Sequence, residues 1–212
     1  MNEPLALADL IAEIPPPGTQ RFLLGIAGPP GAGKSTVTKA VVEALNARDG
    51  NTWAALGMDG FHLSNHELLY LGRRDRKGAF DTFDVNGFVA AIRRVRDETQ
   101  SSVYLPVFHR EIEESIAAEA TIGPEVRGLI IEGNYLLLEQ GGWQAVRPLL
   151  DACWFVDADP LVVRNRLVQR ASATYGSAEA GENWVMRVDE PNGRLIDTTR
   201  VRADRQIRVA DL

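Results

Sequence analysis

The octapeptide GPPGAGKS at residues 28–35 constrains the fold of this 212-residue chain more than any other stretch. It matches the pattern G-x-x-x-x-G-K-[ST] in full, and it stands between an apolar run at 21–27 and a helical pattern at 35–50. A strand, a glycine-rich turn and a helix in this order present backbone N–H groups and a positive helix end to an anion. The stretch therefore predicts a loop that binds the phosphates of a nucleoside triphosphate.

Different residues of this loop are expected to contact different parts of the nucleotide and its metal. Its glycines let the backbone approach the anion, Lys34 can reach the β- and γ-phosphates, and the Ser35 hydroxyl can bind Mg²⁺. The predicted nucleotide contacts are Gly28, Pro29, Pro30, Gly31, Ala32, Gly33, Lys34, Ser35 and Thr36.

Apolar runs and helical patterns alternate along the rest of the chain. The runs at 52–58, 102–108, 128–133 and 151–158 predict strands, and the patterns at 5–14, 85–97 and 159–170 predict helices. This alternation predicts an α/β fold, a P-loop NTPase three-layer sandwich in which helices flank a mostly parallel sheet. Two polar stretches, 71–84 and 171–183, lack periodicity and are predicted to be irregular flaps within a single domain, 1–212.

Charge and composition exclude several other classes of protein. The formal net charge of −6 provides no positive field for nucleic acid or for an anionic membrane. Cys153 is the only cysteine, so no intrachain disulfide can form, and its apolar neighbours predict burial. The N-terminus lacks a secretory pattern, and no apolar run approaches the roughly 20 residues of a membrane span. We expect a soluble, cytoplasmic protein.

Acidic residues follow two of the predicted strands. Asp59 comes directly after 52–58, at the carboxyl end of what we expect to be the strand beside the phosphate loop, and Gly60 lets the chain turn there. Glu132 lies near the end of 128–133, where its carboxylate can hold a water of the Mg²⁺ shell or orient an attacking hydroxyl. A turn and a surface glutamate are the structural alternatives.

The chain lacks the motifs of other classes of nucleotide-binding protein. The stretch DVNG at 84–87 has the D-x-x-G spacing of a GTPase switch, but no N-K-x-D motif follows it. We interpret it as a helix N-terminus capped by Asp84 or Asn86. An LSGGQ-type signature of transport ATPases is also missing.

Five motifs occur in a recognisable order: GPPGAGKS (28–35), MDGFH (58–62), RKGAFDTFD (76–84), PVFHR (106–110) and IIEGNYLLL (130–138). With them the chain resembles the P-loop small-molecule kinases related to uridine kinase, phosphoribulokinase and bacterial pantothenate kinase. It is similar to short bacterial proteins described as nucleoside/nucleotide kinase-like or as fructose-transport kinases. The resemblance covers about residues 20 to 205.

The resemblance implies transfer of the γ-phosphoryl group of ATP, with Mg²⁺, to an alcohol on a small metabolite. It implies that Asp59 is the base and that Glu132 lies near Mg²⁺. It also implies an arginine-bearing lid, about 164–190, and a flap, about 71–84. Arg166 and Arg170 are spaced i, i+4, so they share a helical face from which they can neutralise the transferring phosphoryl group.

Substrate contacts are predicted on basic and imidazole side chains that follow the same strands. His62 can donate to a substrate oxygen, or it can be a packed histidine bonded to backbone. Lys77, His109 and Arg110 can meet an anionic or polyhydroxyl acceptor, or they can be solvated surface groups.

Three functions remain open at this level. The first is an ATP-dependent kinase that phosphorylates a nucleoside, pantothenate or a sugar-like metabolite. The second is a nucleotide kinase, whose acceptor is a phosphate and which would not need Asp59. The third is a nucleotide-sensing protein without turnover. The expected partner is a small-molecule substrate, with no nucleic acid and no membrane, and the resemblance is compatible with a homodimer.

Overall fold

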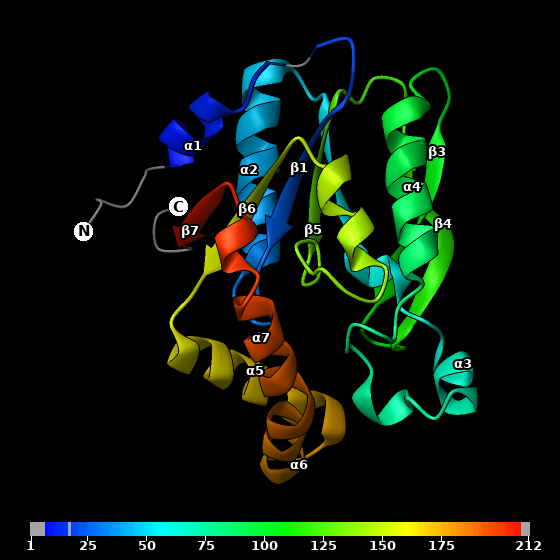
Figure 1. Cartoon of the computed structure of the whole chain (residues 1–212), viewed down its shortest axis with the longest axis vertical. Helices are drawn as coiled ribbons and strands as arrows, with labels where there is room; N and C mark the ends of the chain where they lie inside the picture. Colours follow the sequence, from blue (N-terminus) through cyan, green and yellow to red (C-terminus); the bar gives the residue numbers. More distant parts are fainter. Residues whose placement is uncertain (1–6, 17, 209–212) are drawn as a thin grey trace.

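In the computed structural model, which describes residues 7–16 and 18–208, helices cover both faces of a five-stranded sheet (Figure 1). The strands are β1 (Phe22–Ala27), β2 (Trp53–Gly57), β5 (Gly128–Gly133), β6 (Ala152–Asp157) and β7 (Arg205–Arg208). Every pairing between them is parallel. The predicted three-layer P-loop NTPase sandwich is confirmed.

The order of the strands differs from the expected one. It runs β2-β5-β1-β6-β7, so β5 separates β2 from β1. Gly57 and Ile26 both pair with Glu132, which places the ends of the three strands in one row. The expectation that β2 lies beside the phosphate-loop strand is wrong, and Glu132 occupies the position between them.

One face of the sheet is covered by α1 (Leu7–Glu13) and α2 (Lys34–Asp49), and the other by α4 (Val85–Asp97) (Figure 1). Helix α2 ends at Gly50, whose φ of 77° is the left-handed conformation that glycine adopts without strain. Of the two predicted caps for α4, Asp84 is the one observed, because its side chain accepts from the N–H of Gly87 at 2.8 Å. Cys153 is buried, as predicted.

Strand β3 (Val103–His109) leaves the parallel sheet and pairs antiparallel with β4 (Glu114–Ile122). Pro106 is one physical reason why β3 is not a central strand of the parallel sheet. Proline cannot donate a ladder hydrogen bond, and the register shifts between Leu105 and Val107. The sequence pattern predicts β3 but not its separate sheet, and it predicts neither β4 nor β7. Both missed strands contain few buried residues.

A buried arginine fastens the end of α4 to the neighbouring loop. The Arg21 guanidinium, in a side chain that is almost fully buried, donates to the carbonyl oxygens of Val95, Glu98, Gly123 and Val126 at 2.7–2.9 Å. These oxygens include the last carbonyls of a helix, where a cation is favourable.

The segment predicted to be irregular at 171–183 is helical. Helix α5 (Pro160–Tyr175) ends at Gly176, and α6 (Ala178–Trp184) begins at Ser177, whose side chain accepts from Ala180 N–H. A π-helical turn (Val185–Asp189) then leads into α7 (Glu190–Asp197). These helices extend from one edge of the sheet, opposite α3 (Asn65–Tyr70) and the largely irregular stretch at 71–84 (Figure 1).

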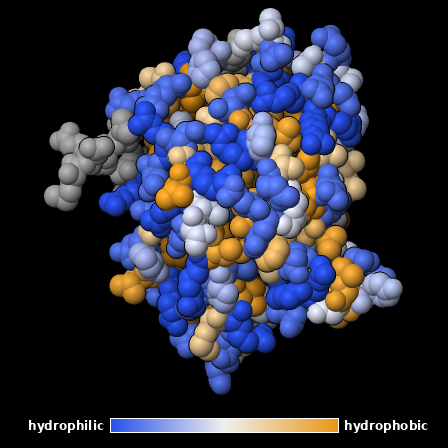
Figure 2. Space-filling model, in the orientation of Figure 1, coloured by the Kyte–Doolittle hydropathy of each residue, from blue (hydrophilic) through white to orange (hydrophobic). Residues whose placement is uncertain are grey.

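The remaining regular elements are short 3₁₀ turns at Met58–Phe61, Arg74–Arg76, Trp143–Ala145, Arg147–Leu149 and Arg200–Arg202. The face shown in Figure 2 is mainly hydrophilic, with small separate apolar areas. Among the helices of residues 7–16 and 18–208, none has the length and apolar character needed to cross a membrane.

Candidate active site

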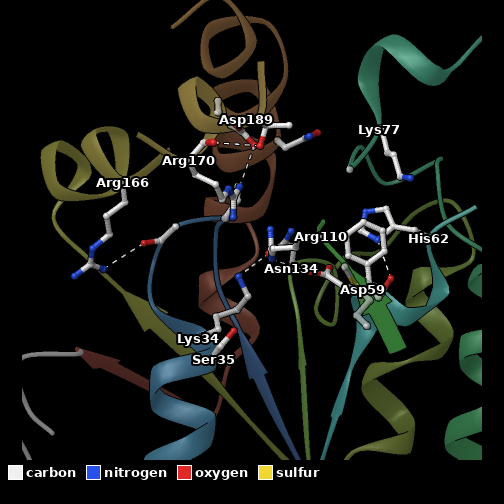
Figure 3. Close-up of a pocket in the computed structure, with 18 of the residues that line it drawn as sticks. Lys34, Ser35, Asp59, His62, Lys77, Arg110, Asn134, Arg166, Arg170 and Asp189 are labelled. Carbon is white, nitrogen blue, oxygen red and sulfur yellow. Dashed lines mark hydrogen bonds and ion pairs between the residues drawn. The ribbon is translucent and has the colours of Figure 1, made fainter. Parts of the chain in front are cut away.

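A cavity of about 530 Å³ opens at the carboxyl edge of the sheet, between the phosphate loop, the 3₁₀ turn after β2 and helix α5 (Figure 3). The loop residues that line it are Pro30, Gly31, Gly33, Lys34, Ser35 and Thr36. Gly28 has a φ of 147°, and a Cβ there would lie 2.8 Å from the carbonyl oxygen of Val156. Gly28 and buried Ala32 therefore shape the loop without lining the cavity.

Lys34 is held at the mouth of the loop by two amide oxygens. Its Nζ donates to the carbonyl oxygen of Pro29 at 3.0 Å and to Oδ1 of Asn134 at 2.6 Å. Burial lowers the pKa of Lys34 to about 8, and the carboxylates of Asp59 and Glu132 act against this shift. An anionic phosphate oxygen binds an ammonium more strongly than these neutral oxygens do, so Lys34 suits an incoming phosphate.

Ser35 and Glu132 form a pair suited to a divalent cation. Ser35 Oγ donates to Glu132 Oε1 at 3.1 Å, while Glu132 Oε2 is buried and has no hydrogen-bond partner among the described residues. Burial raises the pKa of Glu132, and Lys34 opposes this shift. A hydroxyl and a carboxylate with one unpaired oxygen, both beside a phosphate site, fit Mg²⁺. This ion takes few protein ligands and completes its coordination shell with phosphates and water. No cluster of three or more His, Cys, Asp or Glu suited to a metal occurs in the described ranges.

Asp59 lies in the 3₁₀ turn that follows β2. Its Oδ2 accepts from Nη2 of Arg110 at 3.3 Å, and the carboxylate lines the cavity that Lys34 also lines. Gly60 is required here by packing, because a Cβ would lie 2.3 Å from the carbonyl oxygen of Pro106 on β3. The turn therefore places Asp59 at the cavity by packing directly against β3.

His62 matches the alternative interpretation, a packed histidine bonded to backbone. Its Nδ1 lies 2.8 Å from the carbonyl oxygen of Asp59, which can only accept, so Nδ1 carries the proton. The ring packs against Phe83 and Phe108, with centroids 4.0 and 4.6 Å away. Burial lowers the pKa of His62, which favours the neutral ring, and in that form Nε2 is a hydrogen-bond acceptor.

Arg110 and His109 are adjacent, yet only Arg110 lines the cavity. His109 Nε2 lies 2.6 Å from Oε2 of Glu119 on the neighbouring strand. Its position therefore does not support the predicted contact with substrate. Lys77 does line the cavity, and it is a buried side chain rather than the solvated flap residue of the alternative interpretation.

Lys77 connects three segments at this end of the cavity: its own 71–84 stretch, α3 and the β3–β4 turn. Its Nζ donates to Oδ1 of Asn65 at 2.9 Å and, through a short hydrogen bond, to the carbonyl oxygen of Glu113. The ammonium also lies 5.3 Å from the centre of the Phe108 ring. Burial lowers the pKa of Lys77, and Glu114 and Glu113 act against the shift.

Both lid arginines lie on α5 and line the cavity, and Arg170 reaches toward Lys34 whereas Arg166 donates to the carbonyl oxygen of Gly31 at 3.3 Å (Figure 3). Arg170 pairs with Asp189 at 3.9 Å. Asp189 belongs to the π-helical turn, and burial raises its pKa to about 6 against the opposing charges of Arg170 and Arg110.

Sequence reasoning missed Asn134 and Asp189. Asn134 directly follows β5, and polar residues after a strand, such as Asp59, are the sequence signal that could have identified it. Nothing in the spacing of residues around 189 indicates a π-helical turn.

A second groove lies against the outer side of the phosphate loop. Its volume is about 1040 Å³, and Pro29, Pro30 and Arg166 border it together with the first turns of α5 and one face of α7. Exposed Leu161 and Val162 give it an apolar wall. Pro30, Arg166 and Asp189 line both the groove and the cavity, so the two spaces adjoin at these residues.

Comparison with known proteins places this arrangement among kinases. Residues 23–210 match the Phosphoribulokinase / Uridine kinase family. A candidate uridine kinase of Schizosaccharomyces pombe is 35% identical over 175 residues, which are 80% of this chain and 74% of that protein. The pantothenate kinase of Latilactobacillus sakei is 30% identical over 152 residues, 70% of this chain and 48% of that protein.

A solved structure agrees with the fold in detail. The crystal structure of a candidate fructose transport system kinase from Silicibacter sp. TM1040 has a TM-score of 0.87 and 34% identity to this chain. The match covers 95% of this chain and 98% of that one.

Proposed function

The chain belongs to the phosphoribulokinase/uridine kinase family and is a kinase, and from this premise we propose that it transfers the γ-phosphoryl group of ATP to a hydroxyl of a small metabolite, with Asp59 as the base. One observation carries the proposal. The Asp59 carboxylate, the Lys34 ammonium and the Ser35–Glu132 pair line the same cavity. A proton acceptor, a phosphate-binding cation and a metal-binding pair are the parts that phosphoryl transfer to an alcohol needs.

The residues would act in one displacement step. The acceptor hydroxyl gives its proton to Asp59 while its oxygen bonds to the γ-phosphorus, and the bond between that phosphorus and the β,γ-bridging oxygen breaks to release ADP. Lys34 and Arg170 stabilise negative charge on the phosphoryl oxygens. Ser35 and Glu132 would hold Mg²⁺, which when bound would neutralise negative charge on the phosphates.

The second groove is the place we propose for the base and ribose of the nucleotide. It adjoins the phosphate loop at Pro29 and Pro30, on the side away from Asp59. A nucleotide whose phosphates occupy the loop would then enter from the groove, while the acceptor enters from the opposite side. Its apolar wall suits a flat aromatic base.

The names of two relatives state different acceptors, uridine and pantothenate. Both acceptors carry a hydroxyl, which supports an alcohol rather than a phosphate as the acceptor group. They do not distinguish one metabolite from another.

The test is phosphoryl transfer by three proteins: the wild type, Asp59→Asn and the control Asp75→Asn. Asp75 is an exposed carboxylate in the 71–84 stretch that does not line the cavity. With ATP, Mg²⁺ and a panel of nucleosides, sugars, pantothenate and glycerate, we expect Asp59→Asn to lose transfer and keep ATP binding. Turnover like that of the wild type in Asp59→Asn would refute the base, and transfer to none of the panel would favour a nucleotide sensor.

A further inference from the structure

Several groups that accept hydrogen bonds line the acceptor end of the cavity, and one of them, Glu113, has no role in the reaction described above. Glu113 occupies the turn between β3 and β4 with a φ of 54°, a left-handed conformation that non-glycine residues rarely adopt. Backbone strain of this kind is retained where surrounding contacts enforce it, often at ligand sites.

Those contacts are present in the structure. The carbonyl oxygen of Glu113 accepts from Nζ of Lys77 and from Nδ2 of Asn65, the latter at 3.1 Å. The backbone is thereby fixed to α3 and to the 71–84 stretch. Glu113 lines the cavity, and its carboxylate makes no hydrogen bond or ion pair with any residue of the described ranges.

Two further acceptors line the same end of the cavity. His62 is neutral and presents an unprotonated Nε2, and Asp59 presents a carboxylate. Together with Glu113 they can receive hydrogen bonds from several donors on one ligand. A hydroxyl donates such a bond, whereas a carboxylate or phosphate oxygen cannot when it is ionised.

The cations at this end already have oxygen partners. The Lys77 ammonium bonds to Asn65 Oδ1 and to the carbonyl oxygen of Glu113, and Arg110 pairs with Asp59. An anionic acceptor that bound Lys77 would displace the contacts that connect α3, the 71–84 stretch and the β3–β4 turn, and one that bound Arg110 would compete with Asp59. It would also approach the carboxylates of Asp59 and Glu113. Repulsion between like charges opposes that arrangement.

We propose that Glu113 is a specificity residue and that the acceptor is an uncharged polyhydroxyl molecule, whether a free sugar, a polyol or the ribose of a nucleoside. The inference rests on the proposed kinase function. Glu113 and His62 accept from hydroxyls next to the one that reacts at Asp59, and Glu113 also excludes acceptors that carry a carboxylate or a phosphate.

The experiment compares matched acceptors that differ in charge: fructose with fructose 6-phosphate, ribulose with ribulose 5-phosphate, glycerol with glycerate, and pantothenol with pantothenate, with uridine added. We expect kcat/KM to be at least tenfold higher for the uncharged member of each pair that reacts. Glu113→Gln should raise the KM of the uncharged acceptor about tenfold and leave the KM of ATP unchanged. Glu113→Lys should shift preference toward the anionic member.

The control is Glu111→Gln, which alters a more exposed glutamate of the same turn that does not line the cavity and should leave every constant unchanged. Preference for the anionic members, or an unaltered acceptor KM in Glu113→Gln, would overturn this inference while leaving the kinase intact. Absence of transfer to every acceptor, with ATP still bound, would overturn the proposed function itself and the inference with it.

Discussion

Nη2 of Arg110 lies 3.3 Å from Oδ2 of Asp59, so a residue from the β3–β4 turn orients the carboxylate that follows β2. Both side chains are partly exposed, and such a pair contributes up to about 1 kcal/mol. We expect Arg110→Met to lower kcat two- to fivefold and Arg110→Lys to retain most of it. Single-turnover kinetics at saturating acceptor would measure this, and a loss as large as that of Asp59→Asn would show that Arg110 acts on the phosphoryl group directly.

The Ser35–Glu132 pair predicts a change in the requirement for metal. Ser35→Ala removes one of the two protein groups expected at Mg²⁺, so the Mg²⁺ concentration for half-maximal activity should rise about tenfold, which corresponds to about 1.4 kcal/mol. Ser101→Ala, at an exposed position far from the loop in sequence, is the control. Titration of activity with Mg²⁺ at fixed ATP is the measurement, and an unchanged midpoint would remove Ser35 from the metal site.

Asp189 predicts a pH dependence of activity. Its pKa is raised to about 6, with Arg170 and Arg110 as the opposing cations and Tyr135 and Tyr175 as further titratable neighbours. Ionised Asp189 holds Arg170, so kcat should fall as the pH drops below about 6. Asp189→Asn should have a lower kcat at pH 7.5 and should lack this acid limb, whereas the exposed control Glu182→Gln should behave as the wild type does.

Replacing Asp189 by a neutral residue should also stabilise the fold at neutral pH. A carboxyl pKa that is higher in the folded state means that the fold binds the proton more tightly, so stability decreases as the pH rises from about 4 to about 6. At pH 7, Asp189→Asn should increase the free energy of unfolding by about 2 kcal/mol. Urea unfolding at pH 4 and pH 7 would test this, because the gain should vanish at the lower pH.

Arg21 predicts a large loss of stability with no effect on chemistry. Removal of its guanidinium takes a donor from four carbonyl oxygens, of which only that of Gly123 also accepts from a backbone N–H among the contacts of the described residues, so Arg21→Met should cost about 3 kcal/mol. Arg93→Met, on the exposed face of α4, is the matched control and should cost less than about 0.5 kcal/mol. Thermal unfolding is the measurement, and kcat below the transition should remain that of the wild type.

Gly60 predicts a coupled loss of stability and activity. In Gly60→Ala the Cβ would meet the carbonyl oxygen of Pro106 at 2.3 Å, so the turn that carries Asp59 must shift. We expect a destabilisation of about 2 kcal/mol and at least a tenfold lower kcat. Gly18→Ala, where a Cβ meets nothing within 4 Å, should change neither quantity.

The features that local sequence predicts are those in which neighbouring residues determine the conformation. The phosphate loop, the cap of α4 by Asp84 and the end of α2 at Gly50 belong to this class. The three-layer fold follows as well, because the alternation of strands and helices leaves few other arrangements.

The features that were missed depend on pairings between distant segments. The position of β5 between β2 and β1 and the hairpin of β3 with β4 are set by contacts that no short pattern encodes. His109 shows the same limit, because it ends β3 and meets Glu119 on the paired strand, whereas Arg110 lies in the turn that follows and lines the cavity. The hydrogen-bonding role of His62 required knowledge of the carbonyl that its Nδ1 meets.

The row Gly57–Glu132–Ile26 has a consequence for the dimensions of the reaction. Neighbouring strands in a sheet lie about 4.8 Å apart, so the ends of β2 and β1 are separated by roughly 10 Å, with β5 midway. In the proposed reaction, the sheet therefore sets the distances between the acceptor, the metal and the phosphate, each of which would lie at the end of a different strand. Loops and lid residues can vary to suit another acceptor, but backbone hydrogen bonding holds this spacing constant.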